Sequence, residues 1–82
     1  MKYEFIQREL FGDNPVVFYS EYPASRPDFV AEDASYECYY RHDVNMYEWP
    51  LEFEIFELGK SLGIFRIEAE TDPRFKSTKV TK

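Results

Sequence analysis

With 82 residues and a formal net charge of −6, the chain has the size and charge of a single small acidic domain. Eight Phe, seven Tyr and one Trp supply the bulky groups from which so short a chain can build a core. The single cysteine excludes an internal disulfide, and the absence of a long apolar run or an apolar leader argues against the membrane and secretion, so we expect a cytoplasmic protein.

The charge is unevenly distributed along the chain. Residues 21–57 hold ten acidic residues and two arginines, a net −8, whereas residues 72–82 carry a net +3. Repulsion from phosphates makes direct nucleic-acid binding by the acidic middle unfavourable. An acidic middle is suited to basic partners and would speed their encounter at low salt, unless it serves only as a solubilising surface.

Two strands are predicted in the first part of the chain. An alternating pattern over residues 2–10 predicts a strand with Tyr3 and Phe5 on one face. Residues 11–15 contain Gly, Asp, Asn and Pro, which together predict a turn. Residues 16–22 are rich in β-branched and aromatic side chains, so they predict a second strand that pairs with the first as a hairpin.

A helix is predicted between Asp28 and His42, because Pro23 and Pro27 end the second strand. Asp28 would cap a long version of this helix, and Asp33 would cap a shorter one. The 3.6-residue period predicts an apolar stripe made of Phe29, Val30, Ala34, Tyr36 and Tyr40.

A second hairpin has the clearest pattern, because apolar and charged residues alternate over residues 51–57 and 64–70. Gly59-Lys60-Ser61 is predicted to be a three-residue turn. That turn predicts buried pairs Ile55–Phe65, Phe53–Ile67 and Leu51–Ala69, and outer pairs Glu54–Arg66 and Phe56–Ile64. A slip of one residue would bury the glutamates.

These elements predict an α+β fold of the order strand, strand, helix, strand, strand. The expected architecture is a four-stranded antiparallel sheet with one helix packed on one face. We expect residues 1–73 to form this single domain. The basic tail, residues 74–82, is predicted to be either a short edge strand or disordered.

Catalytic and metal-binding patterns are absent from the sequence. Cys38 and His42 are spaced to share one face of a helix, but no other Cys or His is present to complete a zinc site. Glutamates at alternate strand positions share one wet environment, whereas acid–base catalysis needs contrasting ones. We therefore expect no enzyme activity, no cofactor and no metal, with Cys38 a small buried hydrophobe and His42 solvated.

Acidic and aromatic residues are the candidates for binding a partner. The candidates for charge are Glu32, Asp33, Glu37, Glu48, Glu52 and Glu54, and those for contact are Tyr36, Tyr40, Tyr47 and Trp49. The loop that holds Tyr47 and Trp49 is instead a flap over the core in the alternative interpretation. Phe56 and Ile64, both expected on the outer face of the sheet, suggest a homodimer through that face.

The segment from Trp49 to Glu57, with the turn at Gly59 and residues 64–75, resembles small acidic proteins of phages and mobile elements. Among these are anti-CRISPR and anti-restriction inhibitors, and the resemblance lies in size, acidity, aromatic density and the hairpin. It implies a phage-encoded inhibitor whose carboxylates occupy a basic groove of a host nucleic-acid-targeting defence complex, and it identifies no site residue. Binding should then weaken with salt and with charge reversal at Glu52 and Glu54. The alternative is a structural or adaptor protein that forms a homodimer.

Overall fold

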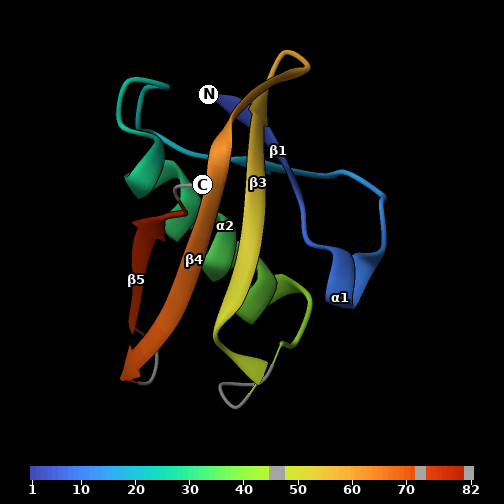
Figure 1. Ribbon diagram of the computed structural model, residues 1–82, viewed down its shortest axis with the longest axis vertical. Coiled ribbons are helices and arrows are strands. Elements are labelled where there is room, and N and C mark those ends of the chain that lie inside the picture. The colour runs from blue at the N-terminus through green and yellow to red at the C-terminus, as the bar shows by residue number, and fades with distance from the viewer. Residues whose placement is uncertain (45–47, 72–73, 81–82) are drawn as a thin grey trace.

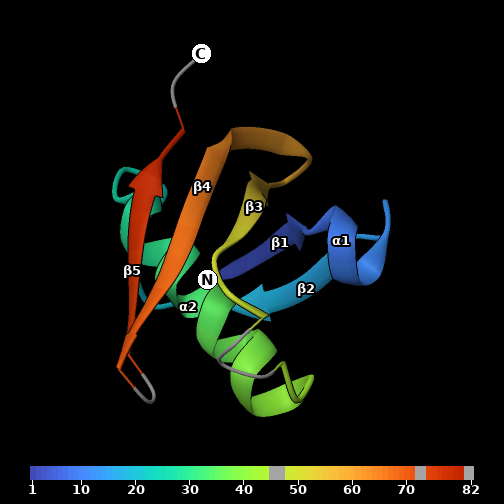
Figure 2. The same ribbon diagram turned by 60° about the horizontal axis from the view of Figure 1, so that its bottom comes forward.

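The computed structural model describes residues 1–44, 48–71 and 74–80, which form one antiparallel sheet with a main helix on one face (Figure 1). The elements are β1 (Lys2–Ile6), α1 (Arg8–Phe11), β2 (Val16–Tyr19), α2 (Pro27–Arg41), β3 (Leu51–Glu57), β4 (Lys60–Thr71) and β5 (Arg74–Lys79). The predicted α+β class is confirmed. The predicted number of strands is wrong, because residues 74–79 pair with β4 and give a five-stranded sheet of order β2-β1-β3-β4-β5 (Figure 2).

The first two strands pair as predicted, but both are shorter than predicted. β1 ends at Ile6 because Gln7 starts α1, its buried side chain accepting a 2.8 Å hydrogen bond from the Leu10 N–H. β2 ends at Tyr19, and the next residue, Ser20, accepts a side-chain hydrogen bond from the backbone of Tyr22. Local side-chain bonds to the backbone therefore end both strands, an effect that apolar alternation does not reveal.

Helix α2 faces the sheet with small side chains rather than with the predicted aromatic stripe. Its buried residues are Val30, Ala31, Ala34, Ser35 and Cys38. The prediction is correct for Val30 and Ala34 and wrong for Tyr40, which is 63% exposed, while Phe29 is half-buried and Tyr36 packs at the edge of the core. The sheet already supplies the bulk of the core, so small residues let the helix approach it closely. The predicted caps are wrong too, since the N-cap is Arg26, which caps without a side-chain bond and is followed by Pro27.

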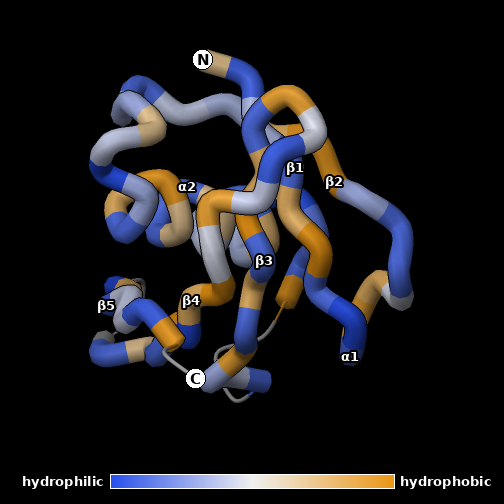
Figure 3. Tube along the Cα trace, turned by 45° about the horizontal axis from the view of Figure 1, so that its top comes forward, coloured by the Kyte–Doolittle hydropathy of each residue, from blue (hydrophilic) through white to orange (hydrophobic). Residues whose placement is uncertain are grey.

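The second hairpin has the predicted faces but a different turn. Leu51, Phe53 and Ile55 point into the core, and the alternation of apolar and polar residues is visible along β3 in Figure 3. The turn consists of Leu58 and Gly59, with φ values of 51° and 80°. Positive φ at both central residues is what a two-residue type I′ turn requires.

This shorter turn changes every predicted cross-strand pair. The observed pairs are Leu51–Ile67, Glu52–Arg66, Phe53–Phe65, Glu54–Ile64, Ile55–Gly63 and Phe56–Ser61. The pairing is shifted by two residues from the prediction, and a shift of two keeps each side chain on its face. Beyond Ile55 the register changes by one residue, which leaves Leu62 unpaired as a bulge.

The turn predicts a stabilising substitution, Leu58→Asn. Leu58 is 98% exposed and holds a left-handed backbone conformation that Asn tolerates better than Leu. We expect Leu58→Asn to raise the free energy of unfolding by about 0.5–1 kcal/mol, measured by urea denaturation. Leu58→Ala is the matched control and should change it little, because Ala is strained there as well. Equal stability of the two variants would contradict this assignment of the turn.

Candidate functional site

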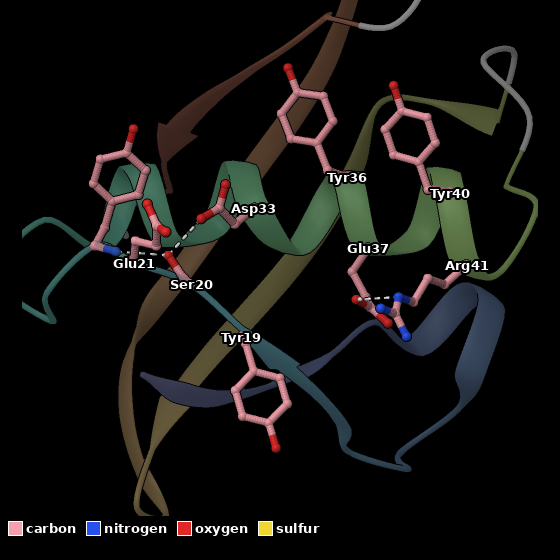
Figure 4. A pocket seen from close by; sticks show the side chains of 9 residues that line it. Tyr19, Ser20, Glu21, Asp33, Tyr36, Glu37, Tyr40 and Arg41 are labelled. Atoms are coloured by element: carbon pink, nitrogen blue, oxygen red, sulfur yellow. Dashed lines mark hydrogen bonds and ion pairs between the residues drawn. The ribbon is translucent and has the colours of Figure 1, made fainter.

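A groove of about 470 Å³ lies between helix α2 and the end of strand β2, and we call it the α2–β2 groove (Figure 4). Nine residues line it: Tyr19, Ser20, Glu21, Tyr22, Asp33, Tyr36, Glu37, Tyr40 and Arg41. It exists because α2 packs mainly against β5, β4 and β3 and less against β2. The helix therefore covers one half of the sheet more closely than the other, and the space beside β2 stays open.

The helical period determines which side chains of α2 enter the groove. Asp33, Glu37 and Arg41 recur at every fourth residue, so they form a row beside the buried stripe, on the side of α2 that faces β2. Tyr36 and Tyr40 form the next row, with ring centroids 6.2 Å apart and planes 14° from parallel. Figure 4 shows Tyr36 and Tyr40 on one side of the helix, Glu37 and Arg41 on the other, and Asp33 pointing toward Ser20.

Ser20 connects the two walls of the groove. Its hydroxyl donates a 2.6 Å hydrogen bond to the Asp33 carboxylate, and its side chain is buried. Its backbone N–H donates to the Met1 carbonyl at 3.0 Å, and its carbonyl accepts from the Met1 amino group at 2.7 Å. Ser20 therefore connects the floor of the groove both to the start of the chain and to α2.

The groove has a surplus of negative charge. Glu37 pairs with Arg41 at 3.6 Å and with the His42 ring at 3.7 Å. Glu21 and Asp33 form no ion pair with any described residue. Three carboxylates and a single guanidinium therefore line the groove together with tyrosines; the Tyr19 ring points away from α2 (Figure 4), and the Tyr36 ring also packs on Phe75 of β5 at 5.1 Å. Carboxylates bind Arg and Lys by charge-assisted hydrogen bonds, and tyrosine faces attract the same cations.

Four of the predicted binding residues meet in this groove, namely Asp33, Tyr36, Glu37 and Tyr40. Residues 19–22, which complete the groove, were predicted only as part of a strand and not as part of a binding site. The run Tyr-Ser-Glu-Tyr at that place combines two exposed aromatic residues with an exposed acid. This composition was the only signal in the sequence, and the pairing of this run with α2 depends on the tertiary structure.

Glu32 lies on the opposite side of α2, against β5. The Ser77 hydroxyl donates a 2.7 Å hydrogen bond to the Asp28 carbonyl and lies 3.4 Å from the Glu32 carboxylate. Burial raises the pKa of Glu32; neighbouring carboxylates act in the same direction, and the hydrogen bonds from Ser77 act in the opposite one. Glu32 therefore belongs to the contact between the helix and β5 and not to the groove.

The remaining predicted residues are placed elsewhere. Glu52 and Glu54 project from the face of the sheet that α2 does not cover, and Glu54 accepts a 2.8 Å hydrogen bond from Ser61. Glu48 is exposed, and Tyr47 lies outside the described residues. The predicted acidic residues thus divide between two opposite faces instead of forming one patch.

Trp49 belongs to the core, in agreement with the flap alternative for this residue. It is 8% exposed, and its ring stacks on Phe53 at 5.8 Å and meets Phe75 at 4.6 Å. Phe56 and Ile64, both half-buried, lie on the outer face of the sheet but not opposite each other. The main helix, α2, packs on the opposite face, and the start of α1 lies beside Glu52, Glu54 and Ile64.

Cys38 and His42 form no reactive pair among the described residues. The Cys38 thiol is fully buried, and burial raises its pKa to about 12. His42 faces Glu37 and the Phe11 ring instead, at 5.2 Å from the latter. Residues 1–44, 48–71 and 74–80 contain no cluster of three or more His, Cys, Asp or Glu that could hold a metal ion.

Comparisons with protein-family models, curated proteins and solved structures gave no significant match. In the described part of the chain, no helix is long and apolar enough to cross a membrane. A functional assignment therefore rests on the α2–β2 groove and on the distribution of charge.

Glu32→Gln tests the assignment of Glu32 to the contact between α2 and β5. A raised pKa means that the folded state holds the proton more tightly than the unfolded state does. The wild type should therefore lose stability as the pH rises from the ordinary value of 4.5 through the folded pKa. We expect Glu32→Gln to have the higher free energy of unfolding at pH 7, and the difference to shrink below pH 4.5, in urea titrations across this range.

The control for this experiment is Glu48→Gln, which removes one negative charge at an exposed position. It should change the stability little at any pH. A Glu32→Gln variant that is less stable than the wild type at pH 7 would contradict the assignment.

Proposed function

We propose that this chain is a non-enzymatic acidic protein that binds a basic partner through the α2–β2 groove. The observation that carries the proposal is the composition of the groove, whose lining holds three carboxylates and several tyrosines but only one arginine. Two of the carboxylates, Glu21 and Asp33, have no cationic partner among the described residues. Such a surface favours arginine and lysine side chains of another molecule.

The proposed partner is a nucleic-acid-targeting defence complex of a bacterial host, and the proposed activity is its inhibition in the host cytoplasm. A complex of this kind holds a basic groove for phosphates, and carboxylates are recognised by the same Arg and Lys side chains. The net charge of −6 supports fast encounter with such a surface. Tyrosines add large contact areas that lose little conformational entropy on binding. The resemblance to phage-encoded inhibitors supports the same function.

The outer face of the sheet is a weaker candidate for this contact, although Glu52 and Glu54 lie there. Glu52 is paired across the sheet with Arg66, which also lies 3.6 Å from Glu68, and Glu68 is opposite Lys76. The acidic residues of the outer face are thus interleaved with basic residues. A contact on one face cannot use both groups of acids, so we assign the partner to the groove and not to Glu52 and Glu54.

A phage-plating assay tests the proposed function. The chain is expressed in bacteria that carry one of a panel of CRISPR or restriction systems directed against a test phage. For at least one system, we expect the phage to plate as it does on cells without that system. Normal defence across the whole panel would overturn the proposal of inhibition.

Two matched double variants identify the binding surface in the same assay. Glu21→Lys with Tyr40→Ala alters the groove, whereas Glu52→Lys with Phe56→Ala makes the same kind of change on the outer face. Both variants change the net charge equally, and circular dichroism checks that both are folded. We expect only the groove variant to restore defence. Loss of inhibition by the outer-face variant alone would contradict the assignment to the groove.

A homodimer through the outer face is a second candidate. The observation that favours it is that α2 packs on the other face of the sheet, which leaves Phe56 and Ile64 half-buried on the side away from α2. Two copies that pack through this face would give a light-scattering mass twice that of the monomer at micromolar concentration, and Phe56→Asp would return it to the monomer. A monomeric wild type would rule this candidate out.

A further inference from the structure

The edge of strand β2 is open and lies beside the α2–β2 groove. Met1 and Ser20 exchange both backbone hydrogen bonds, at 2.7 and 3.0 Å, so they form a hydrogen-bonded pair of the antiparallel ladder. The pairs alternate along the ladder, and the backbone groups of Val17 and Tyr19 therefore point away from β1. Within the described residues no strand pairs with this edge, because β2 ends the sheet.

The two edge strands of the sheet differ in whether they carry residues that hinder pairing with another strand. β5 carries three cationic residues, Arg74, Lys76 and Lys79, and such charges are a common device against pairing with another chain. β2 has the sequence Val-Val-Phe-Tyr, with no charge and no proline, and its register with β1 is uninterrupted. Val17 is 42% exposed and Tyr19 is 72% exposed. The edge strand beside the acidic groove, β2, therefore lacks the charged residues and prolines that hinder pairing with another strand.

We propose that the partner contributes an extended basic segment that adds to the edge of β2 as a sixth strand. This inference rests on the proposed function and specifies how the partner is recognised. The outward N–H and C=O groups of Val17 and Tyr19 would supply the main-chain hydrogen bonds. Side chains of a strand alternate between the two faces of a sheet. Every second residue of the added strand would therefore point toward the α2–β2 groove, whose lining includes Glu21, Asp33 and Glu37.

This geometry specifies the sequence pattern of the segment. Residues on the α2 side are arginine or lysine, because the groove presents carboxylates and tyrosines there. Residues on the other side are apolar or β-branched, because they lie beside the side chains of Val17 and Tyr19. The charge of the groove also argues against a second copy of this chain as the occupant, since pairing two β2 edges would bring two acidic grooves together.

A synthetic peptide of alternating arginine and valine, nine residues long, is the probe. Its affinity for the full chain is measured by fluorescence anisotropy at low salt. A second peptide of the same sequence carries methyl groups on alternate backbone nitrogens, which keeps the charge and prevents strand pairing. We expect the methylated peptide to bind about tenfold more weakly, as the loss of two hydrogen bonds predicts.

Val17→Pro tests the same contact from the side of the protein. The Val17 N–H points away from β1, so proline at this place removes an outward donor and leaves the β1–β2 ladder intact. We expect about threefold weaker binding of the unmethylated peptide, as the loss of one hydrogen bond predicts, whereas the matched control Val17→Thr keeps the N–H and should bind like the wild type. If Val17→Pro does not fold, the comparison of the two peptides on the wild type decides whether the strand is added.

The outcomes separate this inference from the proposed function. Equal binding of the two peptides would overturn strand addition and would leave an acidic groove that attracts basic segments. No binding of either peptide at low salt would overturn both proposals. A wild type that is dimeric, and that Val17→Pro makes monomeric, would identify a second copy as the occupant and would overturn the basic segment.

Discussion

Close packing of small side chains on α2 against a floor of large aromatic residues is the constraint on which this structure depends. Ala31, Ala34 and Ser35 are fully buried and add little volume, while Phe53 and Phe65 fill the space from the sheet. The helix can approach closely only along this stripe. The larger side chains of α2 are therefore displaced to its flanks and its outer side, where tyrosines and acids remain available for contact.

The position of the helix over the sheet decides which surfaces are open. α2 is held against β5 by the Ser77 hydrogen bond to the Asp28 carbonyl and by the contacts of Phe75 with Tyr36 and Tyr39. On the other side it is joined to the end of β2 by the hydrogen bond between Ser20 and Asp33. This polar connection leaves a groove with an open strand edge beside it, so that charge, aromatic surface and unpaired backbone groups occur together.

The distribution of charge is shaped by the same arrangement. The acidic middle of the chain does not fold into a single negative surface, because α2 and β3 present their acids on opposite sides of the sheet. On the outer face, Arg66 and Lys76 lie among the glutamates. The lining of the groove holds three carboxylates but only one arginine. A net charge read from the sequence therefore says less about binding than the local balance of charges does.

Alternation of apolar and polar residues was enough to determine the α+β class, the second hairpin and the faces of its strands. The two-residue period of a strand assigns each side chain to a face, and this assignment does not depend on the exact register of pairing. The two-residue turn at Leu58 could not be predicted, since leucine rarely adopts positive φ and only the closed hairpin makes it do so. Tyr40 was misplaced for a related reason: the volume available beneath a helix is set by the sheet that it packs against. The α2–β2 groove was half predicted, through Asp33, Tyr36, Glu37 and Tyr40. Its other half, residues 19–22, joins them only in the tertiary structure, because a groove between two elements is a property of their packing and not of either sequence segment.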